Sequence, residues 1–244
     1  MIELIDLTKR YGRTLAVDRL SLSVPHGEIF GFIGPNGAGK TTTIRMMGGT
    51  LAPTEGRVVI DGIDMADRPE EAKRRIGFIP DRPFLYEKLT GMEFMRFSAD
   101  LYGVGDGTFQ EKARGILKMF SLLEWSADLI EAYSHGMKQR LIIAAALLHE
   151  PRVIVVDEPM VGLDPAAIKM VKDILKGLAL EGTTIFMSTH TLSVAEDVCD
   201  RIGIIHRGNL IATGTARELK RMARVQEADL EAVFLRLTEG QDLP

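Results

Sequence analysis

A glycine-rich loop near the N-terminus carries the clearest chemical signal in the sequence. It reads Gly34, Pro35, Asn36, Gly37, Ala38, Gly39, Lys40, Thr41, Thr42. This G-x-x-x-x-G-K-[ST] pattern follows an apolar run at 29–33 and precedes a predicted helix, which is the context in which it binds phosphates. Glycines let backbone N–H groups approach an anion, and a helix start directs its dipole toward the same point. We predict a cradle for a magnesium-bound nucleoside triphosphate, with Lys40 at the outer phosphates and Thr41 at Mg²⁺.

An acidic pair, Asp157 and Glu158, follows the β-branched apolar run at 153–156. In open α/β sheets, ligands bind at the carboxyl ends of parallel strands, where this pair would lie. We expect Asp157 to hold Mg²⁺, directly or through water, and Glu158 to polarise the attacking water. A solvent-exposed acidic turn is the competing interpretation, and the glycine-rich loop argues against it.

Composition narrows the class of protein. The chain has 244 residues, 45% of them hydrophobic and 26% charged, as in soluble globular proteins. A net charge of -4 provides no basic field, so nucleic acid is not expected as a partner. A single cysteine, Cys199, excludes an intrachain disulfide. No signal peptide and no run of about 18 apolar residues is visible, so we expect a role at a membrane only through a partner.

The order of predicted elements indicates an α/β fold. Strict alternation at 20–24 favours an antiparallel layer, whereas the continuous run at 153–156 is typical of a parallel strand buried on both faces. Further strands are expected at 2–7, 29–33, 57–62, 75–80, 184–188 and 202–206. We predict a P-loop NTPase core with a mainly parallel sheet and an antiparallel β layer near the N-terminus.

Residues 84–150 show helical periodicity and no convincing strand, which predicts a helical subdomain inserted into the core. Helices are expected at 91–101, at 109–120, from His135 onward and at 194–199. Asp164 with Pro165 predicts another helix start, and Thr215 with Glu218 forms a capping box. We interpret 1–244 as one domain, with a core at 1–83 and 151–214, the insertion at 84–150 and a helical tail at 215–244.

Five segments in fixed order resemble the ATP-binding subunit of ATP-binding-cassette (ABC) transporters. They are residues 34–42, 133–140, 153–159, 162–164 and 188–190. The serine–glycine signature within 133–140, which ends in Gln139 and Arg140, distinguishes this family from other P-loop ATPases. The resemblance extends from about residue 2 to residue 214. It implies ATP and Mg²⁺ as ligands and ATP hydrolysis coupled to transport.

The resemblance also implies roles for single residues. Tyr11 would stack on the adenine, and His190 would contact the γ-phosphate and help to place the water. Two cassettes of this family sandwich two nucleotides head to tail, and Asp164 would organise their interface. The signature would act on the nucleotide of the second cassette, through Ser134, His135, Gly136 and Met137.

The sequence departs from the family pattern at three positions. Asp81 stands where the family usually has Gln, a residue that senses the metal and the attacking water. Because Asp is shorter, we expect a water-bridged contact with Mg²⁺ or an altered coupling to the helical subdomain. His135 replaces the usual Gly, and Met137 replaces the usual Gln.

The signature and the tail segment at 233–240 look like those of exporter-type cassettes, which pair with separate membrane permeases. The resemblance implies a peripheral protein on the cytoplasmic face of the cell membrane, bound to a permease through its helical subdomain, with an identical or a different second cassette. Two alternatives stay open here. One is a non-transport ABC ATPase, and the other is a regulatory module that binds nucleotide without turnover.

Overall fold

The computed structural model describes residues 1–81, 84–223 and 230–239. An antiparallel sheet contains the N-terminal segments, in the order β2-β1-β4-β5. Its strands are β1 (Ile2–Tyr11), β2 (Thr14–Val24), β4 (Glu55–Ile60) and β5 (Ile63–Asp64). The predicted antiparallel layer is therefore confirmed. β2 is longer than the alternation at 20–24 indicated, because its first half, residues 14–19, is largely half-buried and does not alternate between buried and exposed side chains.

The second sheet has six strands in the order β10-β9-β3-β8-β7-β6. All neighbours pair in parallel except β10 with β9. The strands are β3 (Ile29–Ile33), β6 (Ile76–Ile79), β7 (Val153–Asp157), β8 (Thr184–Thr189), β9 (Arg201–His206) and β10 (Asn209–Gly214). The predicted mainly parallel sheet is confirmed, and the end of β3 and the end of β7 reach the same edge.

The parallel sheet is apolar on both faces. Successive residues of β7 alternate, with Val153 and Val155 packing in one cluster and Ile154 and Val156 in another. The first cluster also contains residues of the antiparallel sheet and of α1 (Lys40–Met47), so it fills the space between the two sheets. Burial on both sides explains why these strands are nearly continuous apolar runs.

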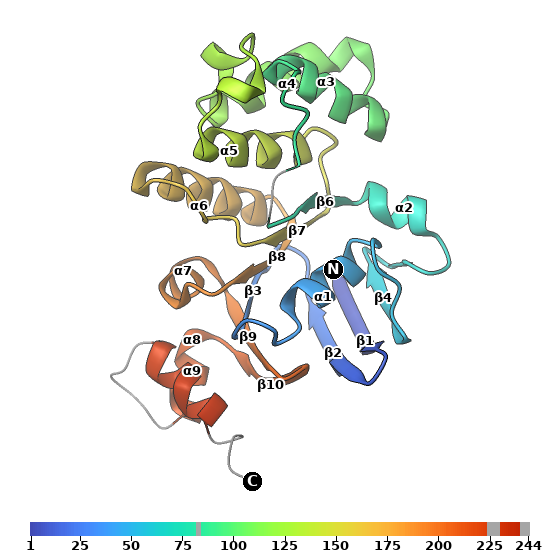
Figure 1. Cartoon of the computed structure of the whole chain (residues 1–244), viewed down its shortest axis with the longest axis vertical. Helices are drawn as coiled ribbons and strands as arrows, with labels where there is room; N and C mark the ends of the chain where they lie inside the picture. Colours follow the sequence, from blue (N-terminus) through green and yellow to red (C-terminus); the bar gives the residue numbers. More distant parts are fainter. Residues whose placement is uncertain (82–83, 224–229, 240–244) are drawn as a thin grey trace.

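The other face of the sheet packs against helices α3 (Gly91–Tyr102), α4 (Asp106–Met119), α5 (His135–Ala146) and α6 (Pro165–Leu180). Figure 1 shows α3, α4 and α5 together at one end of the molecule, with α6 beside them. Residues from α3, α4 and α5 belong to the same apolar cluster as Ile154 and Met187. The helical region thus shares a core with the sheet, although its description as an inserted subdomain stays an interpretation.

The chain after the sheet continues into α7 (Leu192–Val198), α8 (Ala216–Met222) and α9 (Leu230–Glu239). The predicted capping box opens α8, where the Thr215 side chain accepts from the Glu218 backbone and the Glu218 side chain accepts from the Thr215 backbone. Leu230 and Val233 of α9 are buried in a third cluster with Ile33 and Ala195. The C-terminal segment therefore packs near the loop that follows β3 (Figure 1).

Candidate functional site

The loop between β3 and α1 requires glycine at defined positions. Gly39, at the start of α1, has φ 113°, and a Cβ there would lie 2.5 Å from the Ala16 carbonyl oxygen. A Cβ on Gly34 would lie 2.8 Å from Cγ2 of Ile205. No side chain caps the first turn of α1. The free N–H groups of that turn and the bare glycine backbone form the predicted anion cradle.

Lys40 lies within this loop rather than in solvent. Its Nζ donates to the carbonyl oxygen of Gly34 at 2.6 Å and to that of Pro35 at 3.2 Å. The residue is 8% exposed. Burial lowers the pKa of the Lys40 ammonium, and the nearby carboxylates of Glu158 and Asp157 oppose that shift. The structure thus brings the predicted phosphate-binding cation and the predicted acidic pair into one electrostatic neighbourhood.

Asp157, the last residue of β7, is 3% exposed and held from two sides. The Thr41 hydroxyl donates to its Oδ2 at 3.1 Å. The Ser188 hydroxyl donates to its Oδ1. Hydroxyl and carboxylate oxygens are the ligands that Mg²⁺ prefers, and Mg²⁺ sites usually combine one or two carboxylates with substrate phosphates. Among the described residues no cluster of three His, Cys, Asp or Glu side chains forms a separate metal site, and the Thr41–Asp157 pair fits a magnesium ion shared with a nucleotide.

Glu158 follows directly, and its carboxylate lies against the imidazole of His190. Glu158 Oε1 lies 2.9 Å from Nδ1 of His190, and its Oε2 accepts from the His190 backbone at 3.4 Å. The backbone of Glu158 is left-handed, with φ 53°, and its N–H donates to the Ser188 carbonyl oxygen at 3.2 Å. The turn after β7 and the loop after β8 therefore place a carboxylate and an imidazole side by side.

Two other predicted site residues lie at the margins of this neighbourhood. Tyr11 ends β1, is 47% exposed and has Nζ of Lys9 5.4 Å from its ring centroid. Its ring is therefore available to a planar ligand such as a base. Asp81 is exposed, two residues after Ile79, which pairs with Val156 of β7. Among the described residues Asp81 makes no hydrogen bond or ion pair, so its predicted link to the metal stays a prediction.

The signature residues lie together, but on a different part of the chain. Ser134 caps α5, and its hydroxyl accepts from the Met137 backbone at 3.2 Å. Asp164 caps α6, accepting from the Ala167 backbone at 2.8 Å. A Cβ on Gly136 would lie 3.4 Å from the Gly162 carbonyl oxygen and 3.6 Å from Cδ2 of Leu163, so the signature lies beside the segment that precedes α6. Within the described residues the Ser134 side chain has no hydrogen bond to the glycine-rich loop of the same chain.

The sequence prediction missed Ser188 as a support of the site. Asp157 and Ser188 are paired in the parallel register of β7 and β8, which places their side chains on the same face. The apolar pattern had already placed both residues at the ends of adjacent predicted strands. The missing signal was the register between strands, which a single sequence does not contain.

Comparisons with known proteins agree with this geometry. A family model described as "ABC transporter" matches residues 17–161. The linearmycin resistance ATP-binding protein LnrL of Bacillus subtilis (strain 168) is 38% identical over 90% of this chain and 70% of its own length. The bacitracin transport ATP-binding protein BcrA of Bacillus licheniformis is 41% identical over 92% of this chain and 72% of its own length.

Solved structures are similar over most of the chain. One described as the ATP-binding subunit of an ABC transporter has a TM-score of 0.91 and 34% identity, and it covers 97% of this chain and 99% of its own. A dimeric, post-hydrolysis structure of the ATP-binding cassette MJ0796, bound to ADP and Pi, has a TM-score of 0.77 and 27% identity over 88% of this chain and 98% of its own. Among the described residues of the present chain, no helix has the length and apolarity to cross a bilayer.

Proposed function

The chain belongs to the ABC transporter family, as an ATP-binding and ATP-hydrolysing subunit, and on this basis we propose how its residues bind and hydrolyse Mg-ATP. The observation that carries the proposal is the position of Glu158. Its carboxylate pairs with His190, and the adjacent Asp157 accepts a hydrogen bond from Thr41. A phosphate cradle, a magnesium ligand pair and a general base thus occupy one edge of the sheet.

The loop from Gly34 to Thr42 binds the phosphates. Its backbone N–H groups contact the anion, and Lys40 exchanges the carbonyl oxygens of Gly34 and Pro35 for the outer phosphate oxygens. Thr41 and Asp157 are the residues that would hold Mg²⁺, and Asp81 would contribute through a bridging water. When bound, the ion would neutralise charge that develops on the phosphates. Tyr11 stacks on the adenine ring.

Glu158 accepts a proton from the attacking water, and His190 keeps the carboxylate aligned. Because Nδ1 of His190 lies 2.9 Å from Glu158 Oε1, the two side chains fix each other. His190 also contacts the γ-phosphate and helps to place the attacking water.

A complete site requires two cassettes. The signature residues Ser134 to Met137 contact the γ-phosphate held by a second cassette, and Asp164 lies at the interface. Ser134, His135 and Asp164 are all exposed, as that role requires. The MJ0796 cassette, which is similar to this chain, has a dimeric structure bound to ADP and Pi. ATP binding closes the pair and hydrolysis releases it, so the cycle is a nucleotide-driven conformational change.

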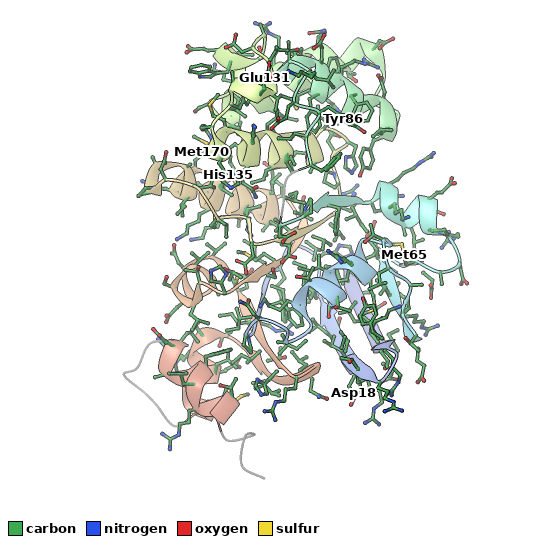
Figure 2. The ribbon with its side chains drawn as sticks, viewed as in Figure 1. Asp18, Met65, Tyr86, Glu131, His135 and Met170 are labelled. Atoms are coloured by element: carbon green, nitrogen blue, oxygen red, sulfur yellow. The ribbon has the colours of Figure 1, made fainter. Side chains whose placement is uncertain are left out.

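The helical region binds the membrane permease. Three aromatic side chains lie exposed in a row there, with Phe84 80%, Tyr86 49% and Phe97 37% exposed. Tyr86, labelled in Figure 2, stands edge-on to both neighbours. Its ring centroid lies 6.1 Å from that of Phe84 and 5.1 Å from that of Phe97. The two named relatives act in linearmycin resistance and bacitracin transport, which supports an exporter. The subunit then lies on the cytoplasmic face of the membrane.

Lys40→Ala tests the nucleotide cradle. A charge-assisted hydrogen bond is worth about 1.5–3 kcal/mol, so we expect the affinity for Mg-ATP to fall about 10- to 100-fold. Lys118→Ala is the matched control, because Lys118 is exposed on α4, away from the loop. Titration of each purified protein with a fluorescent ATP analogue measures the affinity.

Unchanged affinity in Lys40→Ala would contradict the assignment of the loop. A phosphate-release assay on the unmodified protein, with and without EDTA, tests the magnesium requirement: phosphate release that persists in EDTA would contradict the proposed metal site.

A further inference from the structure

His135 of the signature lies directly against Gly162, in the segment that follows the acidic pair. If Gly162 carried a Cβ, that atom would collide with Cδ2 of the imidazole and lie 2.5 Å from its Nε2. The neighbouring Gly136 is also close, because a Cβ there would lie 3.4 Å from the Gly162 carbonyl oxygen. Figure 2 labels His135 where α5 and α6 approach each other. The start of α5 thus packs on a glycine of another segment.

Gly162 is joined to Glu158 by two tight turns. The Val161 N–H donates to the Glu158 carbonyl oxygen at 3.3 Å, and the Leu163 N–H donates to the Met160 carbonyl oxygen at 3.3 Å. Met160 is 8% exposed and anchors the segment in the core. Asp164 then begins α6. The two turns and the buried Met160 hold this segment in a fixed shape. A displacement of Glu158 would therefore also displace Gly162.

The contact is not explained by core formation. His135 and Gly162 are both exposed, and Gly162 has φ 77°, where a non-glycine residue is disfavoured. The ring fills the space beside the glycine without burying either residue. Its consequence is geometric: the residue after Ser134 is fixed relative to the segment that carries Glu158.

We propose that His135 is a positioning residue that couples the two nucleotide sites of the cassette pair. Glu158 serves the nucleotide bound by its own chain, whereas Ser134 serves the nucleotide of the other cassette. Through the contact of His135 with Gly162, the position of the turn after β7 sets the position of Ser134. This inference rests on the proposed function, and it adds a role for the residue by which the signature departs from the family pattern.

A double-mutant cycle on the full-length protein tests the coupling. The variants are His135→Ala, Gly162→Ala and the two combined, with steady-state phosphate release as the readout. Contacting residues couple by about 0.5–3 kcal/mol, so we expect each single change to lower kcat at least about twofold, and the double variant to retain at least about twofold more activity than the product of the two effects predicts. The KM for ATP should stay unchanged, because the glycine-rich loop is intact.

Two controls separate positioning from a general structural effect. His135→Phe keeps a flat ring over Gly162, so its kcat should stay close to that of the unmodified protein, and its thermal midpoint should match because residue 135 is exposed. His26→Ala combined with Gly162→Ala should show multiplicative effects, since His26 lies outside the site. Multiplicative effects in the His135 cycle, or an unchanged kcat in His135→Ala, would overturn the inference. If Lys40→Ala still lowers the affinity for Mg-ATP about 10- to 100-fold, as predicted, the proposed function survives that failure.

Discussion

Asp157 illustrates how single residues prepare this site for its ligands. Its two carboxylate oxygens accept from Thr41 and Ser188, one oxygen each, and only 3% of the residue is exposed. A carboxylate held in this way has its lone pairs directed before a metal binds, so less ordering is required on binding. Lys40 is prepared similarly, because the loop carbonyls already hold its ammonium.

Ser188→Ala should therefore raise the Mg²⁺ concentration required for hydrolysis more than it lowers the affinity for nucleotide. Loss of an outer-shell partner typically costs about 10- to 100-fold in metal affinity or activity, so we expect the Mg²⁺ concentration for half-maximal phosphate release to rise about tenfold. Ser23→Ala, on the exposed side of β2, is the control. A Ser188→Ala protein with the same magnesium requirement as the unmodified chain would show that this hydrogen bond has no such role.

At the residue scale, the sequence indicated candidate side chains for the site, and the structure brings Lys40, Thr41, Asp157 and Glu158 together, but the sequence did not indicate how they are held. The spacing of Lys40 and Thr41 has a defined mechanism, so it could be interpreted without coordinates. The hydrogen bond from Ser188 to Asp157 depends on the register of two parallel strands, and the contact of His135 with Gly162 depends on how two loops approach. Neither leaves a periodic or spacing signal.

Elements with strong periodic or capping signals were predicted well. The continuous run of β7 and the cap of α6 by Asp164 are confirmed. In contrast, α2 (Pro69–Arg74) and β10 were not predicted. The first is short and almost wholly polar, with only Ala72 buried, and the second is an edge strand with one buried residue. Short elements at an edge owe their conformation to neighbours rather than to their own pattern.

The junction of α3, α5 and β6 contains a titratable group that links these elements. The His149 ring stacks on Tyr102 with centroids 3.7 Å apart, and its Nε2 lies 3.0 Å from the Ile76 carbonyl oxygen. Within the described residues its Nδ1 has no hydrogen-bond partner. Burial lowers the pKa of His149, and the Ile76 carbonyl opposes that shift only in part. The folded protein therefore favours the neutral ring.

This lowered pKa predicts a loss of stability in acid. The contribution is present above the unfolded value of about 6.5 and is lost as the pH falls through the lower folded pKa. His149→Phe keeps the stack but cannot be protonated. We expect this variant to unfold at a lower temperature than the unmodified protein at pH 7, since the Ile76 carbonyl loses its partner. Between pH 7 and pH 5, however, its thermal midpoint should fall by less than that of the unmodified protein. Calorimetry that shows the same fall in thermal midpoint for both proteins would contradict this prediction, because the two proteins share all other titratable groups.

At the scale of the whole molecule, three surfaces lie on separate parts of the chain. The nucleotide cradle is at one edge of the parallel sheet, the signature and Asp164 are at the starts of α5 and α6, and the aromatic row of Phe84, Tyr86 and Phe97 lies beside α3. This separation supports the proposal that a complete nucleotide site requires two cassettes. The sequence motifs indicated the first two surfaces, whereas the aromatic row depends on which side chains the fold leaves exposed.

Phe84→Ser tests the third surface. We expect less of this protein to sediment with the membranes of cells that produce its transporter, because an exposed aromatic anchor is lost from the interface. Basal phosphate release by the purified protein should not change. Leu180→Ser is the control, since Leu180 is 90% exposed but lies at the end of α6. If the two variants associate equally with the membranes, the aromatic row is not part of the surface that binds the permease.

The role of Glu158 is the claim on which the account depends most, and Glu158→Gln tests it most directly. Titration with Mg-ATP should give an affinity close to that of the unmodified protein, because the loop and the Thr41–Asp157 pair are untouched. Phosphate release should fall at least about 100-fold, since the amide cannot accept the proton of the attacking water. Glu181→Gln, an exposed change at the end of α6, should behave like the unmodified chain. Phosphate release by Glu158→Gln near the unmodified rate would contradict the account.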